Sequence, residues 1–502
     1  MCARSARALL GALVISYEVS EHPGAGDLAA WPGPQPRRSG GVLLAALVWA
    51  PTLLVSAVLY VVGGAPYALP AVALGFVVHS LLVTRVAIYG LVFSIAIFLV
   101  VGGLTPNLSV AKMAGIFAAL VSVPRLLTVL RGSRWDPMVK WVAAFLAFAL
   151  ASVVLSAYRL WSLWRWLSLL LVYSAPLLLA LHIREEGHLK MALVVLIAGC
   201  AILAAALLGA GGLSPEAIEF AGTRTYVYGV IGGERQDVNE SGRILCIGLF
   251  ACIFLLLVSR GLARKLLAFV MGLVMVVGIL AVKGRACWVF APLAILGGIV
   301  WLKGVGMGKR LLVVVSILLL GGAFLYVAAT VGLLGEGIRQ RLLTVLDPTS
   351  RISRLALWKG FLNASVQRGF MGNGLDMTPI SRAVIEAHGR PGAAHNDFIS
   401  LLGDVGIIGL GLFVGIHLHL LGRIRRITQP WHKLFCMMVW LFILGAGLTQ
   451  TDYARKYYAL SIALIILSVR LDEARRERMQ QEEAQQQSAL GQQRPAPEGA
   501  TP

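Results

Sequence analysis

Long apolar stretches, separated by short polar ones, run along most of the chain. Between residues 42 and 470 they recur with lengths of about 17–23 residues, enough to cross the hydrocarbon core of a bilayer. Hydrocarbon offers no partner to backbone polar groups, so each stretch is expected to be a helix. The pattern predicts an all-α polytopic membrane protein with about 12–14 transmembrane helices. The predicted spans are 42–62, 67–83, 87–106, 111–130, 139–157, 161–182, 189–210, 240–259, 264–282, 286–303, 309–330, 398–420, 431–449 and 455–470.

The composition agrees with a membrane protein and argues against nucleic acid and metal ions as partners. Apolar residues make up 58% of the 502, and charged residues only 14%, a balance that excludes a soluble protein. The net charge of +20 lies mainly in short segments between apolar runs, which is typical of cationic loops rather than of a nucleic-acid surface. The six cysteines lack CxxC spacing, and no His, Cys and carboxylate set has the spacing of metal ligands. We therefore expect no nucleic-acid partner, no metal and no cofactor.

The distribution of Lys and Arg predicts the orientation in the membrane. Opposite loops such as 105–107 are poor in charge, so the positive-inside rule places the N-terminus in the cytoplasm. We predict a cytoplasmic N-terminal tail at 1–41, a transmembrane domain at 42–470, and a cytoplasmic tail at 471–502 that extends the last helix and then becomes disordered. The predicted cytoplasmic cations are Arg85, Arg131, Arg134, Arg184, Lys190, Arg260, Arg264, Lys265, Lys303, Lys309, Arg310, Arg423, Arg425, Arg426, Arg475, Arg476 and Arg478.

Two long segments face the other side of the membrane in this topology, at about 211–241 and 331–396. Loops of this length are unusual unless they carry function. The second has apolar residues at roughly helical spacing, which predicts an amphipathic helix on the membrane surface. Those residues are Ile352, Leu355, Leu357, Trp358, Phe361 and Leu362.

A histidine stands where the second long segment returns to an apolar run. His395-Asn396 is followed after nine residues by Gly406-Ile407-Ile408-Gly409. An imidazole at the membrane edge can reach both water and a lipid-borne substrate, and histidine is the side chain best suited to proton transfer near neutral pH. The alternative is a packed or capping histidine, with Asp397 and Asp404 as helix-start residues.

Arginines on the outward side break the positive-inside trend. Arg285 lies at the outer edge of a span, and Arg351 and Arg354 lie on the predicted amphipathic helix, with Trp358 on the face of Arg354. A guanidinium group binds phosphate oxygens in a bidentate manner and stays charged. Snorkelling of Arg285, and a solvated helix face for the other two, are the structural alternatives. Three more arginines occupy the first outward segment: Arg224, Arg235 and Arg243.

Taken together, these residues resemble the O-antigen ligase superfamily of bacterial inner membranes, which includes O-antigen ligases, O-antigen polymerases and protein O-oligosaccharyltransferases. The likeness is firmest over about residues 220–420. It is carried by His395-Asn396-x9-Gly406-x2-Gly409, by Arg354-x3-Trp358 followed by Gly372-Asn373-Gly374, by Gly284-Arg285, and by Asn239 near the start of a span.

The resemblance implies a metal-independent, inverting glycosyltransferase of the inner membrane. Its donor would be an undecaprenyl-diphosphate-linked glycan, its acceptor a glycolipid or glycan, and its active site periplasmic. His395 would correspond to the catalytic base, with Arg285 and Arg354 binding the diphosphate and Arg351 competing for the second of these places. The supporting residues would be Asn396, Trp358, Asn239 and Arg235. The family often has Ser-Arg-Gly where this chain has Gly284-Arg285-Ala286, so both residues next to Arg285 depart from the family pattern.

Three functions are compatible with the sequence. The His-Asn-x9-Gly-x2-Gly motif favours ligation of O-antigen to lipid A–core, and a polymerase of the same superfamily is the first alternative. A transporter is the alternative from another class, and it predicts acidic residues inside the spans and broken helices at mid-bilayer. The interiors of the predicted spans are almost free of acids, which favours the enzyme.

Overall fold

The molecule is seen here in a computed structural model. It describes residues 65–101, 103–105, 108–132, 136–209, 226–228, 235–282, 284–302, 306, 308, 311, 315, 349–375 and 394–492. The predicted tail 1–41 and the predicted spans 42–62 and 309–330 lie wholly or almost wholly outside these residues. The chain divides into two units, 1–72 and 73–502, and only the start of α3 is described in the first.

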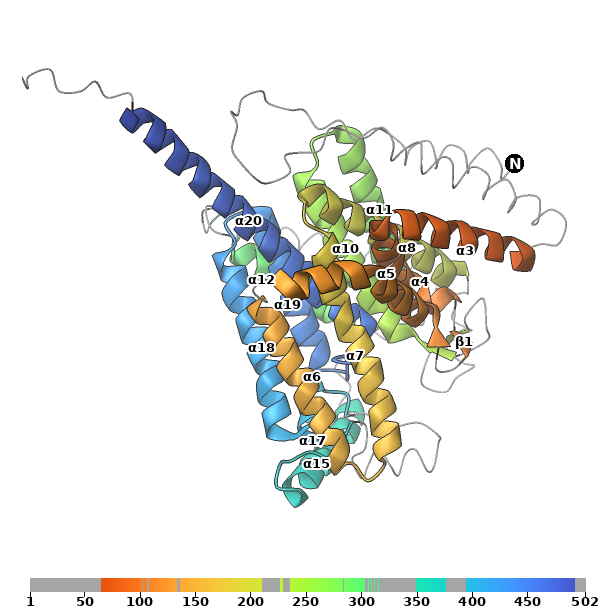
Figure 1. Ribbon diagram of the computed structural model, residues 1–502. Coiled ribbons are helices and arrows are strands. Elements are labelled where there is room, and N and C mark those ends of the chain that lie inside the picture. The colour runs from red at the N-terminus through yellow and green to blue at the C-terminus, as the bar shows by residue number, and fades with distance from the viewer. Residues whose placement is uncertain are drawn as a thin grey trace, which may run out of the picture. The chain divides into compact units, whose positions relative to one another are not determined.

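The described part is built from α-helices, with two short antiparallel hairpins, β1–β2 and β3–β4 (Figure 1). The all-α prediction is confirmed. The elements are α3 (Ala65–Leu82), α4 (Thr84–Val101), β1 (Gly103–Thr105), β2 (Leu108–Ser109), α5 (Val110–Gly132), α6 (Pro137–Leu155), α7 (Arg159–His182), α8 (Glu186–Gly209), β3 (Tyr226–Tyr228), β4 (Arg235–Asp237), α10 (Val238–Val258), α11 (Leu262–Val282), α12 (Arg285–Val300), α15 (Thr349–Gln367), α17 (Asp397–Asp404), α18 (Gly406–Arg426), α19 (Pro430–Gly447) and α20 (Lys456–Gln492).

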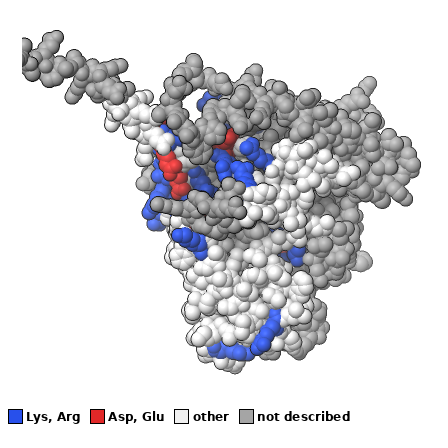
Figure 2. Space-filling view, viewed as in Figure 1, with Lys and Arg blue, Asp and Glu red and all other residues white. Residues whose placement is uncertain are grey.

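Seven of the described helices are long and apolar enough to cross a membrane: α6, α7, α8, α10, α11, α18 and α19. Two shorter apolar helices, 84–97 and 286–300, lie within α4 and α12. Figure 2 agrees with a multi-pass protein, because uncharged surface over α6 and α18 separates the charged residues along α20 from those over α15. The predicted count of about 12–14 spans includes the two that lie outside the described residues.

The predicted span 398–420 is wrong, because two helices occupy it. The short α17 ends at Asp404 and α18 begins at Gly406, whose φ of +77° belongs to the left-handed region. A glycine reaches this region without the steric cost that a Cβ imposes. The apolar run continues through the break, so hydropathy alone does not reveal it.

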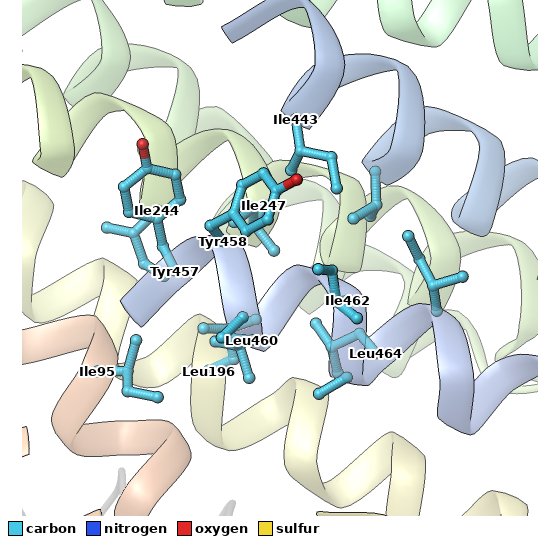
Figure 3. Packing of buried hydrophobic residues seen from close by; sticks show 14 of the residues in the cluster. Ile95, Leu196, Ile244, Ile247, Ile443, Tyr457, Tyr458, Leu460, Ile462 and Leu464 are labelled. Carbon is cyan, nitrogen blue, oxygen red and sulfur yellow. The ribbon is translucent and has the colours of Figure 1, made fainter. Parts of the chain in front are cut away.

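The last predicted span forms the centre of the helical bundle. Residues 457–469 of α20 are buried, and this part of the helix contacts α4, α7, α8, α10 and α19. Figure 3 shows Tyr457, Leu460 and Leu464 of this helix among isoleucines from neighbouring helices. The last helix extends into the predicted tail, since α20 continues to Gln492 and its side chains are largely exposed after Arg475; the cytoplasmic location of the tail stays a prediction.

Polar contacts tie helix ends together on the side where α18 ends, which we call the Arg423 end. Arg423 at the last turn of α18 donates from Nη1 to Asp136 Oδ1 (2.8 Å) and from Nη2 to Glu473 Oε2 of α20 (2.5 Å). Asp136 also caps α6, because its Oδ1 accepts from the Met138 amide (2.8 Å). The opposite side, where α18 begins and where α15 and α17 lie, is called the His395 end (Figure 1).

The Asp136 carboxylate makes stability at the Arg423 end depend on pH. Burial works to raise the pKa of Asp136, but the Met138 amide and the Arg423 charge outweigh it and hold the pKa below its ordinary value of 3.8. A depressed acid pKa stabilises the folded state above 3.8 and loses this effect as pH falls through the folded value. Asp136→Asn keeps a capping acceptor but loses the ion pair, so we expect a loss of about 1–2 kcal/mol at pH 7. The difference between the unfolding midpoints of the variant and of wild type in detergent should therefore shrink as pH falls below 3.8. A difference that is constant with pH would contradict this.

Candidate functional site

His395 lies half-buried in the turn just before α17, at the His395 end. Its φ of +54° is unusual for a residue with a Cβ, and such strain persists only where the surroundings hold it. One anchor comes from α15, where Trp358 Nε1 donates to the carbonyl of Ala394 (2.8 Å). The other is Asn396, which begins the next helix. The backbone on both sides therefore determines where the imidazole stands.

Asn396 is the N-cap of α17, so the capping role considered for His395 belongs to its neighbour. The Asn396 Oδ1 accepts from the amides of Phe398 (3.0 Å) and Ile399 (3.1 Å). Its Nδ2 donates to the carbonyl of Leu448 just beyond α19 (3.3 Å). Asn396 thus satisfies two amides of the first turn and links α17 to α19.

The helix predicted in the second long segment is present as α15, and its place on the membrane surface stays a prediction. It contacts α17 through a face that includes the buried Phe361, and it exposes Leu355 and Leu362 on another. The predicted phosphate-binding residues Arg351 and Arg354 lie in its first two turns, and Arg354 precedes Trp358 by one turn. The side chains of these two arginines are outside the described part of the structure.

The Gly372-Asn373-Gly374 turn closes the other end of α17. The amide and the Nδ2 of Asn373 both donate to the carbonyl of Gly403 (2.9 and 3.0 Å), and the Gly374 amide donates to that of Asp404 (2.9 Å). The carbonyl groups in the last turn of a helix have no hydrogen-bond donor within that helix, and the 372–374 turn supplies donors to two of them. The glycines are required, since both have positive φ and a Cβ on Gly372 would lie 2.7 Å from the Asp404 oxygen.

Replacing Gly406 by alanine should destabilise this arrangement. A Cβ there would lie 2.3 Å from the Phe370 oxygen, and the φ of +77° adds strain, so we expect a loss of about 2–4 kcal/mol. Gly411→Ala is a matched control in the same helix, because a Cβ there meets no atom within 4 Å and alanine favours helix by about 1 kcal/mol. Thermal unfolding in detergent should show midpoint changes of opposite sign for the two variants; equal midpoints would contradict the need for glycine at position 406.

A second group of predicted residues gathers around the start of α12. Arg285 is the first residue of that helix, and Gly284 before it is buried. A Cβ on Gly284 would lie 3.4 Å from Asn239 Oδ1, so the first turn of α10 lies against the Gly284-Arg285 motif. Arg235 precedes α10 in the hairpin, where it pairs with Tyr228. The side chains of Arg285 and Arg235 are outside the described residues.

Arg243 was expected in the first outward segment, and this is wrong. It lies one turn beyond Asn239 in α10 and its side chain is buried. Its guanidinium forms an ion pair with Asp452 and donates to Tyr457 Oη and Gln450 Oε1, both at 2.8 Å. A buried charge requires such partners, because desolvation would otherwise make it very costly.

The same connection between α19 and α20 holds α17. Asp397 Oδ1 accepts from the amides of Asp452 (2.5 Å) and Tyr453 (2.9 Å), and Tyr453 Oη donates to Asp404 Oδ2 (3.1 Å). Burial raises the pKa of Asp397, and the Asp452 charge raises it further against the effect of the two amides. Asp397 begins α17 as expected, but Asp404 ends that helix instead of starting one.

Buried polar contacts thus connect α10 to the segment beside His395, because Arg243 pairs with Asp452 and the Asp452 amide donates to Asp397 of α17. One turn before Arg243, Asn239 lies next to Gly284, so α10 also borders the Gly284-Arg285 motif. The local sequence pattern does not predict this connection. The one signal for it in the sequence is an acidic residue, Asp452, between two apolar runs. Among the described residues, no three His, Cys, Asp or Glu side chains gather as a metal site would require.

Comparison with known protein families gives a match to the O-antigen ligase family over residues 284–414. This range contains Gly284-Arg285, α15, the Gly372-Asn373-Gly374 turn, His395-Asn396 and the glycines of α18. No curated protein matches the chain. The matched residues are those that carry the resemblance in the sequence, so over this range the chain is similar to the O-antigen ligase family.

Proposed function

We propose that this protein transfers a glycan from an undecaprenyl-diphosphate donor to an acceptor hydroxyl, and that the reaction is ligation of O-antigen to lipid A–core. The match to the O-antigen ligase family supports a glycosyltransferase-like membrane enzyme. The observation that carries the proposal is the hydrogen bond from Trp358 Nε1 to the Ala394 carbonyl. It connects α15, the helix that contains Arg351 and Arg354, to the residue before His395. A proton acceptor and a candidate phosphate ligand thereby belong to adjoining segments.

In the proposed reaction His395 is neutral and accepts the proton of the acceptor hydroxyl. The oxygen forms a bond to the anomeric carbon from the face opposite the diphosphate. The bond from that carbon to the phosphate oxygen breaks, and its electron pair leaves with the diphosphate, so the anomeric configuration inverts. Arg285 and Arg354 stabilise the charge that grows on the leaving group, with Arg351 as the alternative to Arg354. A diphosphate is a good leaving group, so no general acid and no metal step are required.

In this proposal the remaining predicted residues do not react; they position the residues that do. Asn396 and Trp358 hold the backbone on either side of His395, which supports roles in aiming the imidazole. Asn239 lies against Gly284 and supports the start of α12, and Arg235 leads into α10 from the hairpin. We assign the His395 end to the periplasmic face of the inner membrane and both tails to the cytoplasm, following the charge distribution of the loops.

Reconstitution tests the proposal directly. Purified protein in liposomes, given an undecaprenyl-diphosphate-linked glycan and lipid A–core, should form the conjugate without added divalent metal. Formation should persist in EDTA. Absence of any conjugate with active donor and acceptor, or dependence on a metal, would contradict the proposal.

A polymerase would use the same base and diphosphate site with another lipid-linked repeat as acceptor. Lipopolysaccharide gels of a deletion strain separate the two activities. Loss of a ligase removes all long chains from the core, whereas loss of a polymerase leaves one repeat attached. Substrate uptake by proteoliposomes without any transfer would instead favour a transporter.

A further inference from the structure

Three arginines gather at the Arg423 end, which is the end opposite the proposed glycosyltransferase site. Arg85 lies in the first turn of α4, Arg125 in the second half of α5, and Arg184 in the connection between α7 and α8. These helices contact one another, and the charges of Arg85 and Arg184 both act on Arg125. Two histidines, His182 and His188, complete the group, which we call the arginine cluster.

The hydrogen bonds of the two histidines indicate that both rings are neutral. Arg85 Nη1 lies 2.6 Å from His188 Nε2, and a guanidinium only donates, so Nε2 accepts. Ser122 Oγ donates to the Ala118 carbonyl (2.6 Å), so it accepts from His182 Nε2 (2.9 Å). The Nδ1 of His182 is then free to accept from Arg125 Nη1 (3.4 Å).

One donor of the arginine cluster lacks an acceptor in the described part of the chain. Because His188 Nε2 accepts, its proton resides on Nδ1, and this buried atom has no hydrogen-bond partner there. A buried donor without a partner is costly, and such groups usually meet water or a ligand. This N–H therefore indicates a missing acceptor beside Arg85.

Positive charge at the arginine cluster exceeds the negative charge near it. Glu185 is the nearby carboxylate, 3.9 Å from His188 and largely exposed, while Glu186 is engaged by Lys190 at 2.7 Å. Three guanidinium groups are thus accompanied by one exposed carboxylate, and the charges of Arg85 and Arg184 repel that of Arg125. An anion placed among them would remove this repulsion and gain charge-assisted hydrogen bonds.

We propose that the arginine cluster binds the phosphate of an anionic phospholipid. The phosphate oxygens accept from the three guanidinium groups and from His188 Nδ1. Anionic headgroups at the cytoplasmic surface attract cationic residues at helix ends, and the loop charges assign the Arg423 end to that surface. This site is independent of the proposed glycan transfer.

The test measures thermal unfolding of the full-length protein in a non-ionic detergent. Phosphatidylglycerol should raise the midpoint by about 5 °C, and equal phosphatidylcholine or inorganic phosphate should not. Arg85→Gln/Arg125→Gln/Arg184→Gln should lose most of this shift. The matched control Arg260→Gln/Arg264→Gln/Lys265→Gln removes three charges from the same end and should keep it.

The single variant Arg184→Gln keeps the test valid if the triple variant fails to fold, because Arg184 is exposed in a connection between helices. It should unfold like wild type without lipid and show a reduced shift with phosphatidylglycerol. An equal shift in the cluster variant and the control, or none in wild type, would overturn the proposal. A shift of the same size with inorganic phosphate would overturn the lipid as its source.

Discussion

His395→Ala should lower glycan transfer by about 10²–10⁴-fold, the usual effect of removing a general base. The variant should remain inserted and folded, because the contacts that hold this turn come from the Ala394 backbone and from Asn396. The measurement is conjugate formation by purified protein at equal amounts. Normal transfer by His395→Ala would exclude the imidazole as the base.

Two further variants separate chemistry from structure at this position. His395→Gly removes the imidazole and also relaxes the positive φ, so its transfer should be equally low while its folding stability rises. Added imidazole should restore part of the activity of the glycine variant, which a purely structural role does not predict. His419→Ala, a half-buried histidine of α18, is the matched control and should leave transfer unchanged.

Arg243→Ala should give the largest loss of folding stability, about 3–5 kcal/mol. The reason is that Asp452, whose side chain is 0% exposed, would keep a buried charge without its cation. The measurement is equilibrium unfolding in detergent. Lys190→Ala removes the cation of the solvent-accessible pair with Glu186 and should cost less than about 1 kcal/mol.

Removing both charges distinguishes a buried ion pair from a simple packing defect. Arg243→Met/Asp452→Leu leaves no unpaired charge, and such replacements are often neutral or stabilising. We therefore expect the double variant to unfold within about 1–2 kcal/mol of wild type, clearly above Arg243→Ala. Losses that simply add would show that the two residues do not act as a pair.

The site was partly predictable from local pattern. The spacing of apolar residues predicted the helix α15. Trp358 of this helix forms a hydrogen bond with the carbonyl of Ala394, the residue before His395. The break at Gly406 was missed, because apolar residues continue on both sides and the conformation depends on the distant Phe370 turn. Arg243 was misplaced for the same reason, since its partner Asp452 lies 209 residues away.

The sequence by itself determined that this is a helical membrane protein and which family it resembles. Hydrocarbon admits few backbone structures, and the motif residues at 285, 354 and 395 are local features of the chain. Only the tertiary structure decided that α17 is a separate short helix and that Asp397, Asp452 and Arg243 connect it to α10. Contacts of this kind depend on which helices become neighbours, and periodicity along one helix carries no record of its partner.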